Sequence, residues 1–167
     1  MNSTADKTVA PQAIAGEYLS FRLGAEEYGI PILMVQEIRV YSEATQIANA
    51  PKHIKGVVNL RGVIVPIIDL RILFDQSTVA YDEQTVTIVL NIGGKVIGVV
   101  VDGVSDVVAL KGVDIKVPPA MGDALATDYV TGIATVTQAD QERMLILMDI
   151  ERLLRGEELG LAVSGDQ

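Results

Sequence analysis

Hydrophobic and polar residues alternate along residues 18–23 of the chain. Leu19, Phe21 and Leu23 share one face of this stretch, whereas Tyr18 belongs to the other, largely polar face. Successive side chains of a β-strand point to opposite sides, so this alternation predicts a half-buried strand.

A second alternating stretch covers residues 85–92. The adjacent Gly93 and Gly94 can supply the positive φ angles of a tight hairpin turn, and the β-branched run 96–101 follows them. These features predict two antiparallel strands joined by a short turn.

The pattern recurs within the chain. Gly24 and Gly29 match Gly93 and Gly98 at one offset (93 − 24 = 69 and 98 − 29 = 69), and the apolar positions around them match as well. The segment around Asp69 recurs near Asp149. The chain is therefore predicted to contain two copies of one unit, and each copy is too small to bury a large core alone. We expect the copies to pack around a shared core.

Short strands separated by glycines favour small closed β-barrels. Two short helices are also predicted. Asp149 can cap a helix with an apolar stripe at Ile150, Leu153 and Leu154 that ends at Gly156, and Asp69 can cap a shorter turn. The predicted class is all-β with short helices, including one near the C-terminus.

Length and composition limit the possibilities. The chain has 167 residues, no cysteine, a net charge of −9 and a pI near 4.5. An acidic chain is a poor candidate for binding nucleic acid or anionic lipid. The sequence shows no signal peptide and no membrane span, so we expect a cytoplasmic protein with no direct membrane insertion. Residues 1–15 and 156–167 are predicted to be flexible tails.

Catalytic chemistry finds little support in the sequence. His53 is the sole histidine, and loop packing is a simpler role for it than catalysis. Asp102, Asp106 and Asp114 lack the spacing of a calcium loop and are interpreted as solvated loop carboxylates. The glycine pair at 93–94 joins two strands and is not followed by the helix that a phosphate loop requires. We expect no enzyme activity, no metal and no cofactor.

Arg61 stands between Leu60 and Gly62 in an otherwise apolar segment. A guanidinium among apolar side chains is costly unless it is paired. Two interpretations remain open: a structural ion pair, for instance with Glu37, or a rigid cationic group presented to a partner.

Several long motifs resemble one known family in sequence and order. They are EEYGIPILMVQEIR (26–39), IANAPKHIKGVVNLRGVIVPIIDLRILF (47–74), TIVLNIGGKVIGVVVDGVSDVV (87–108), and LATDYVTGIATV followed by RMLILMDIERLL. Over residues 17–155 the chain resembles the CheW family of chemotaxis coupling proteins. These adaptors join transmembrane chemoreceptors, the methyl-accepting chemotaxis proteins, to the histidine kinase CheA.

The resemblance implies a fold of two packed, five-stranded SH3-like β-barrels. We expect one domain over 16–155, with barrels near 17–82 and 83–155 whose strands could be exchanged, and a monomer when free.

By resemblance, the tip of the receptor's cytoplasmic hairpin would dock between the barrels at Ile32, Val35, Glu37, Gly56, Arg61 and Val104. The regulatory domain of CheA would contact Val40 and Tyr41 on one face, and the loop 115–121, chiefly Lys116 and Met121, on another. Such a protein would be recruited to membrane-associated receptor arrays.

Alternatives remain. A fused receiver domain is not expected, because nothing follows residue 167, and an intact kinase is not expected, because no ATP-binding segment precedes residue 17. A small-molecule-binding double barrel or a hydrolase would need a deep polar pocket, and no cluster of polar residues predicts one.

Overall fold

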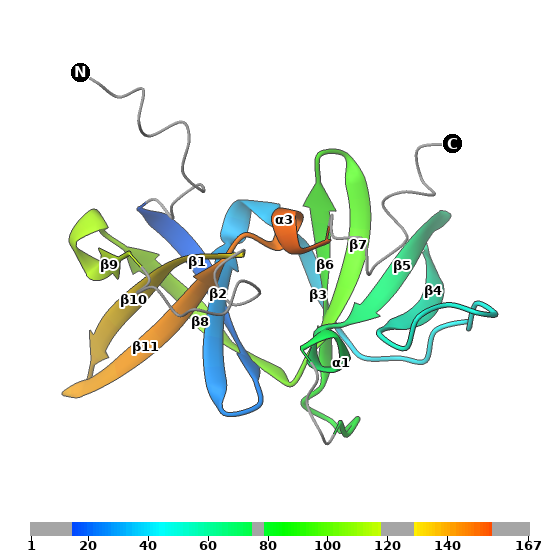
Figure 1. Ribbon diagram of the computed structural model, residues 1–167, viewed down its shortest axis with the longest axis horizontal. Coiled ribbons are helices and arrows are strands. Elements are labelled where there is room, and N and C mark those ends of the chain that lie inside the picture. Colours follow the sequence, from blue (N-terminus) through cyan, green and yellow to red (C-terminus); the bar gives the residue numbers. More distant parts are fainter. Residues whose placement is uncertain (1–14, 75–78, 118–128, 155–167) are drawn as a thin grey trace.

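The computed structural model describes residues 15–74, 79–117 and 129–154, and these residues form two packed β-sheets (Figure 1). In spatial order, the six-stranded sheet consists of β8 (Gly103–Leu110), β1 (Gly16–Leu23), β2 (Glu26–Pro31), β11 (Gln141–Met148), β10 (Val130–Gln138) and β9 (Ile115–Lys116). The five-stranded sheet consists of β3 (Val35–Val40), β6 (Val86–Ile92), β7 (Lys95–Val101), β5 (Val63–Asp69) and β4 (Ile54–Leu60). Four short helices complete these ranges: η2 (Ile32–Met34), α1 (Leu70–Leu73), η3 (Gly112–Asp114) and α3 (Ile150–Leu154).

The mostly β class with short helices is confirmed, although one sheet has six strands where five were expected. The additional strand is the two-residue β9, which pairs with β10 at the edge of the sheet. The predicted hairpin of 85–101 is present as β6 and β7, which run antiparallel from Val86↔Val101 to Ile92↔Lys95.

The two sheets do not divide the chain into consecutive halves. The five-stranded sheet takes its strands from residues 35–101, whereas the six-stranded sheet combines residues 16–31 with strands that follow residue 102. Strands from opposite ends of the sequence share one sheet because β2 pairs in parallel with β11, which places residues 27–29 beside residues 145–147. A boundary between residues 82 and 83 therefore does not separate the sheets.

The internal repeat is visible in the packing of two glycines. Gly29 lies opposite Leu147 in the parallel pair β2–β11, and Gly98 lies opposite Ile67 in the parallel pair β5–β7. A Cβ atom at either glycine would come within 3 Å of that partner's side chain. The repeated glycine thus permits the same close approach in both sheets.

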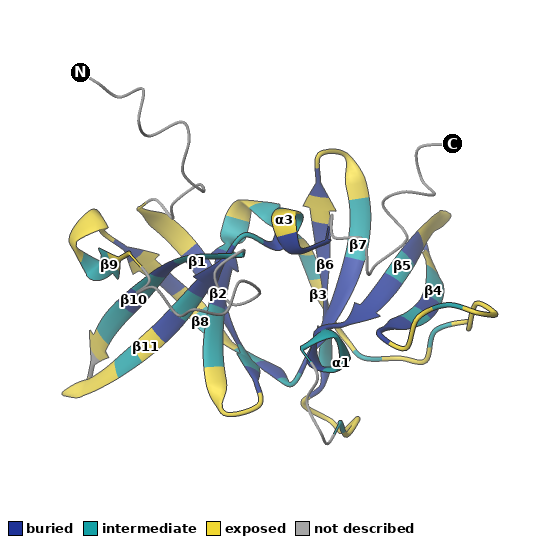
Figure 2. Cartoon of the chain, in the orientation of Figure 1, coloured by how far each residue is buried: buried dark blue, intermediate teal, exposed yellow. Residues whose placement is uncertain are grey.

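A shared core joins the two sheets, as expected from the size of each half. Leu19 and Phe21 of β1 belong to the same buried cluster as Ile88 of β6 and Val99 of β7. The prediction that β1 is buried on one face only is wrong, since Tyr18 is 4% exposed and packs in a second cluster inside the six-stranded sheet. Figure 2 shows the buried residues along the strands of both sheets and the exposed ones at the ends of the hairpins.

Both predicted helix caps are confirmed. The Asp69 carboxylate accepts a hydrogen bond from the backbone N–H of Arg71 at 3.0 Å, and the Asp149 carboxylate accepts one from Arg152 N–H at 3.0 Å. The stripe of α3 is buried, while its predicted end at Gly156 lies outside the described residues. None of the helices in the described part of the chain is long and apolar enough to cross a membrane.

Candidate interaction surface

The chain passes between the sheets at η2 and again between β7 and β8, and apolar residues lie at both places. Ile32 belongs to η2, Val35 begins β3 and Val104 is the second residue of β8. All three are partly buried and pack against the shared core. We call these three residues the junction surface. Its members come from distant parts of the sequence, yet the fold places each at a boundary between the sheets.

Leu33 adds an apolar side chain to this region that the sequence prediction did not include. It lies within η2 and is 95% exposed. An isolated exposed leucine is ordinary, but a fully exposed one between Ile32 and Val35 enlarges the apolar area offered to a partner. The uninterrupted apolar run from Pro31 to Val35 was the available signal.

Glu37 and Arg61 form an ion pair near the surface. Arg61 Nη2 lies 2.6 Å from Glu37 Oε1, and Arg39 Nη1 lies 3.0 Å from Glu37 Oε2. The hydrogen bonds from Arg39 and then Arg61 lower the pKa of Glu37 below its ordinary value. The carboxylate is thus held ionised between two guanidinium groups.

Arg61 does not lie inside an apolar strand, contrary to the expectation from its neighbours. It occupies the turn between β4 and β5, with φ 51°, and Gly62 follows with φ 91°. The Asn59 side chain accepts a hydrogen bond from Gly62 N–H at 2.8 Å. Two consecutive positive φ angles between paired strands are typical of a type I′ hairpin turn. The turn leaves 65% of the Arg61 side chain exposed even though it is paired.

Gly56 has a local structural role and is not brought against Arg61. Its φ of 135° accompanies a register shift in β4, and a Cβ atom there would lie 2.0 Å from the carbonyl oxygen of Thr45. Thr45 and Val57 form an isolated β-bridge at this point. Gly56 therefore allows the segment after β3 to lie directly on β4.

The residues predicted to contact a kinase lie on different sheets. Val40 ends β3 and is 68% exposed, and the next residue, Tyr41, packs its ring 4.6 Å from that of Tyr81. Burial is the main cause that raises the pKa of Tyr41. Lys116 is exposed in β9, at the outer edge of the six-stranded sheet (Figure 1), and Met121 lies outside the described residues.

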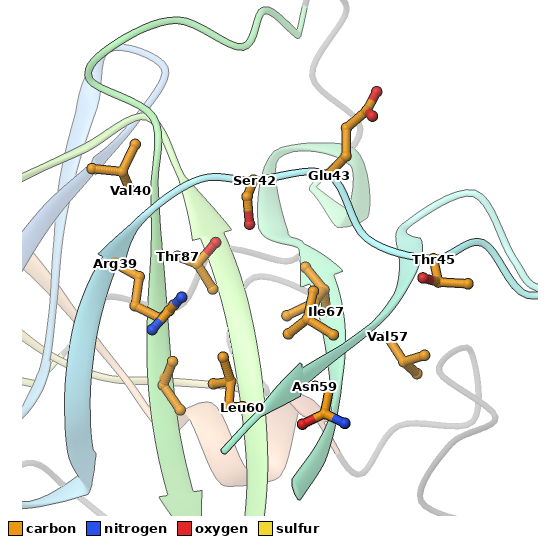
Figure 3. A pocket seen from close by; sticks show the side chains of 12 residues that line it. Arg39, Val40, Ser42, Glu43, Thr45, Val57, Asn59, Leu60, Ile67 and Thr87 are labelled. Carbon is orange, nitrogen blue, oxygen red and sulfur yellow. The ribbon is translucent and has the colours of Figure 1, made fainter. Parts of the chain in front are cut away.

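A cavity of about 250 Å³ opens between β3 and β4, the two edge strands of the five-stranded sheet (Figure 3). Arg39 and Glu43 are the titratable residues among its described lining, and Leu60 and Ile67 contribute apolar walls. Ligand pockets are generally larger than about 300 Å³ and gather several convergent polar groups. This cavity is smaller than that range, whereas a second cavity of about 410 Å³, lined by Tyr41, Glu43, Ala44, Gln46, Lys55 and Tyr81, falls within it.

The interpretation of Asp102 and Asp106 as solvated loop carboxylates is wrong. Arg143 bonds to Asp106 at 3.0 Å and to Glu27 at 3.0 Å, and the buried Ser20 hydroxyl donates to Asp106 at 2.6 Å. The bonds from Arg143 and then Ser20 lower the pKa of Asp106. Asp102 is paired with Arg71 at 3.0 Å.

His53 is buried, in keeping with a packing role. Its carbonyl oxygen accepts a hydrogen bond from the backbone N–H of Asp69 at 2.7 Å, which fixes the end of β5 against the segment that precedes β4. Asp114 accepts a hydrogen bond from Lys111 N–H at 2.8 Å and so closes the short helix η3.

Comparisons with known proteins agree with one another. The family model described as the CheW-like domain matches residues 17–158. "Chemotaxis protein CheW" of Klebsiella aerogenes is 57% identical over 153 residues, which cover 92% of this chain and 90% of that protein. Protein FrzA of Myxococcus xanthus is 29% identical over 90% of this chain and 92% of its own length. The crystal structure of the scaffolding protein TtCheW from Thermoanaerobacter tengcongensis superposes with a TM-score of 0.70 at 31% identity, covering 81% of this chain and 90% of that one. The chain therefore belongs to the family of chemotaxis scaffold proteins built on the CheW-like domain.

Proposed function

We propose that this protein couples chemoreceptors to the histidine kinase CheA. The observation that carries the proposal is the junction surface, a partly exposed apolar area between two sheets with the exposed, paired Arg61 on the neighbouring hairpin. Apolar anchors together with an arginine are typical of protein interfaces. A scaffold requires surfaces of this kind and no reaction centre, so we propose that the protein is not an enzyme.

The receptor would dock on the junction surface through the tip of its cytoplasmic helical hairpin. An amphipathic helix buries apolar side chains at spacings of three and four residues, and Ile32, Val35 and Val104 offer the matching apolar contacts. Arg61 would donate hydrogen bonds to the polar edge of that helix. Its ion pair with Glu37 orders the guanidinium before binding, which lowers the entropy lost in the complex.

The kinase would use two separate faces. One contains Val40 and Tyr41 at the end of β3, and the other contains Lys116 in β9 together with Met121, which lies outside the described residues. Faces on different sheets allow one adaptor to contact two neighbours at once, as an extended array requires. We propose that the free protein is a cytoplasmic monomer that joins membrane-associated receptor arrays through these contacts.

The test is CheA autophosphorylation with receptor-containing membranes, in the presence and absence of this protein. Strong stimulation that attractant then suppresses would support the coupling function. A folded protein that gives no stimulation, in an assay where a homologous adaptor does, would reject it for that receptor and kinase set.

A further inference from the structure

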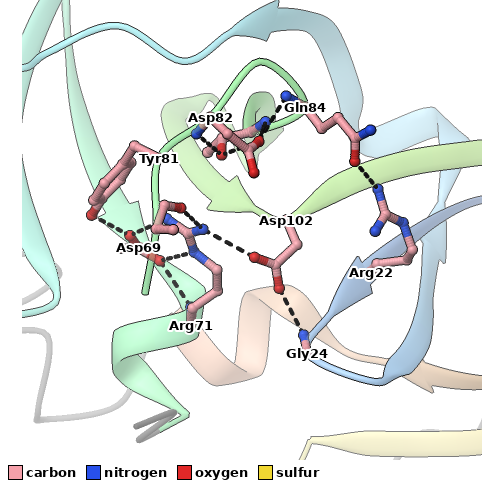
Figure 4. A network of polar contacts seen from close by, with 10 residues as sticks. Arg22, Gly24, Asp69, Arg71, Tyr81, Asp82, Gln84 and Asp102 are labelled. Atoms are coloured by element: carbon pink, nitrogen blue, oxygen red, sulfur yellow. Dashed lines mark hydrogen bonds and ion pairs between the residues drawn. The ribbon is translucent and has the colours of Figure 1, made fainter. Parts of the chain in front are cut away.

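A partly buried polar network lies where β7 passes into β8, and Asp102 is at its centre (Figure 4). One carboxylate oxygen, Oδ2, accepts a hydrogen bond from Gly24 N–H at 2.7 Å, in the turn between β1 and β2. The other, Oδ1, accepts from Arg71 Nη1 at 3.0 Å. Asp102 N–H also donates to the carbonyl of Arg22 at 3.0 Å. A single residue thus bonds to both sheets.

Arg71 is held firmly on the side of the five-stranded sheet. Its side chain is 1% exposed and binds Asp69 through Nε at 3.0 Å and Nη2 at 2.9 Å. Nη1 also donates to the carbonyl of Ala80 at 2.6 Å, and the guanidinium lies 4.7 Å from the centre of the Tyr81 ring. Burial opposes the charge, but the hydrogen bonds to Asp69 and Asp102 outweigh it and raise the pKa of Arg71. Asp102 therefore bonds to a cation that has little freedom to move.

The start of β8 is confined on the side of the six-stranded sheet as well. A Cβ atom on Gly103 would lie 2.0 Å from Nη2 of Arg22, so the backbone approaches this guanidinium closely. The next residue, Val104, belongs to the junction surface and pairs in register with Phe21. A change in the position of Asp102 would be transmitted directly to Val104.

We propose that Asp102 is a positioning residue that, through Arg71 and Gly24, sets the placement of the two sheets relative to each other. It thereby aligns Val104 on one sheet with Ile32 and Val35 at the other crossing of the chain. The consequence for receptor binding rests on the proposed function, whereas the consequence for sheet placement does not. If only a tenth of the molecules keep the aligned arrangement, apparent affinity falls about tenfold.

The absence of cysteine makes a direct distance measurement possible. Spin labels at Met144→Cys on β11 and Ile64→Cys on β5 occupy exposed positions on different sheets. Double electron–electron resonance then gives the distribution of distances between them. Asp102→Asn should broaden or shift this distribution. The asparagine amide replaces one accepting oxygen with an N–H₂ donor, which cannot accept the hydrogen bond from Gly24 or Arg71.

Two control variants separate positioning from general stability. Asp114→Asn makes the same substitution at a carboxylate that accepts a hydrogen bond from Lys111 N–H in its own loop, and Val89→Ala weakens the separate core cluster of the five-stranded sheet. Both should keep the wild-type distribution, although Val89→Ala lowers the melting temperature. Asp102→Glu keeps the charge on a longer side chain, and should shift the distribution without broadening it, even if Asp102→Asn fails to fold.

The receptor arm uses the purified cytoplasmic fragment of a chemoreceptor and the label-free variants. Asp102→Asn should bind about tenfold more weakly, and the controls should bind as wild type does. An unchanged distance distribution in both Asp102 variants would overturn the proposal, as would a broadened distribution with undiminished receptor affinity. Failure of the wild-type chain to bind any receptor fragment would reject the proposed function instead, and the distance measurement would still decide the role of Asp102.

Discussion

The two hairpins of the five-stranded sheet have the same turn but different residues at its tip. Arg61 and Gly62 join β4 to β5 with φ angles of 51° and 91°, and Gly93 and Gly94 join β6 to β7 with φ angles of 59° and 91°. Each turn is closed by an asparagine two residues before it, which accepts a hydrogen bond from the N–H of the second turn residue, Gly62 at 2.8 Å or Gly94 at 3.0 Å. The first position is arginine in one hairpin and glycine in the other.

This difference separates what the fold requires from what a partner requires. A left-handed conformation costs a residue with a Cβ atom roughly 1 to 2 kcal/mol, and glycine avoids this cost. Gly93 is therefore the choice that favours stability. Arg61 has the left-handed conformation despite this cost, and its exposed guanidinium is paired with Glu37. Strain retained at a position where glycine would fit is a reason to assign function to that residue.

The largest expected effect comes from reversing charge at the two tips. Arg61→Asp should weaken binding to a receptor fragment by more than about tenfold, because it removes the guanidinium and places a carboxylate beside Glu37. Lys95→Asp reverses a charge next to the other turn and should leave binding within about twofold of wild type. Titration calorimetry measures both. Equal losses would mean that the hairpins do not differ in function.

Replacing the glycine at the second turn position should affect both hairpins alike. Gly62→Ala and Gly94→Ala each place a Cβ atom on a residue with φ 91°, and each should lower the free energy of unfolding by about 1 to 2 kcal/mol. Urea denaturation followed by circular dichroism provides the measurement. A cost in one hairpin alone would show that the turns are not energetically equivalent.

The asparagines provide a finer comparison. Asn59→Ala and Asn91→Ala each remove the side-chain hydrogen bond that closes a turn, at an expected cost of about 1 kcal/mol. Only Asn59→Ala should also reduce receptor affinity, since it loosens the turn that holds Arg61. The same denaturation and calorimetry experiments test this, and reduced affinity in Asn91→Ala would argue against it.

Arg61→Gly should separate stability from binding most cleanly. Relief of the left-handed strain is partly offset by the greater freedom of glycine in the unfolded chain, so stability should rise by less than about 1 kcal/mol. Receptor affinity should fall equally in Arg61→Gly and in Arg61→Ala, because both lack the guanidinium. Arg61→Ala retains the left-handed strain. A variant that is markedly less stable than wild type would restore the interpretation of Arg61 as a structural ion pair.

The smallest effect is a change in proton binding at Glu37. Hydrogen bonds from Arg39 and Arg61 lower its pKa, so the stabilisation from this pair is present above the unfolded-state pKa and is lost as pH falls through the folded-state value. In Arg61→Gly the folded-state pKa should rise toward its ordinary 4.5, so the stabilisation should be smaller and its loss should be complete at a higher pH. Nuclear magnetic resonance titration of the Glu37 side chain measures this, with Lys95→Asp as the control.

Local patterns predicted much of the fold because strands and caps depend on nearby residues. The alternation in β1 and β6, the glycine turn before β7 and the caps at Asp69 and Asp149 all follow from short sequence segments. The placement of Arg61 was missed although a local signal existed. Asn59 and Gly62 have the same spacing as Asn91 and Gly94, and that match predicts a turn.

The polar networks could not have been predicted in the same way. Arg71 and Asp102 are 31 residues apart, and Arg143 reaches Ser20 across 123 residues. Pairing at such separations depends on which strands become neighbours. The repeat shows that the two units are similar, but it is equally compatible with consecutive and exchanged strands. The apolar members of the junction surface were named from family resemblance, and their assignment to receptor binding stays a prediction.

The parallel pairing of β2 with β11 also affects the order in which the protein can fold during synthesis. All strands of the five-stranded sheet leave the ribosome as one continuous stretch, whereas β2 must wait for a partner that begins at Gln141. At a synthesis rate of roughly 5 to 20 residues per second, this delay is about 5 to 20 s. Throughout that interval one edge of β2 has no strand beside it, and nascent chains on neighbouring ribosomes expose the same edge. The long separation in sequence between β2 and its partner β11 thus leaves the β1–β2 hairpin exposed to mispairing while the chain is being made.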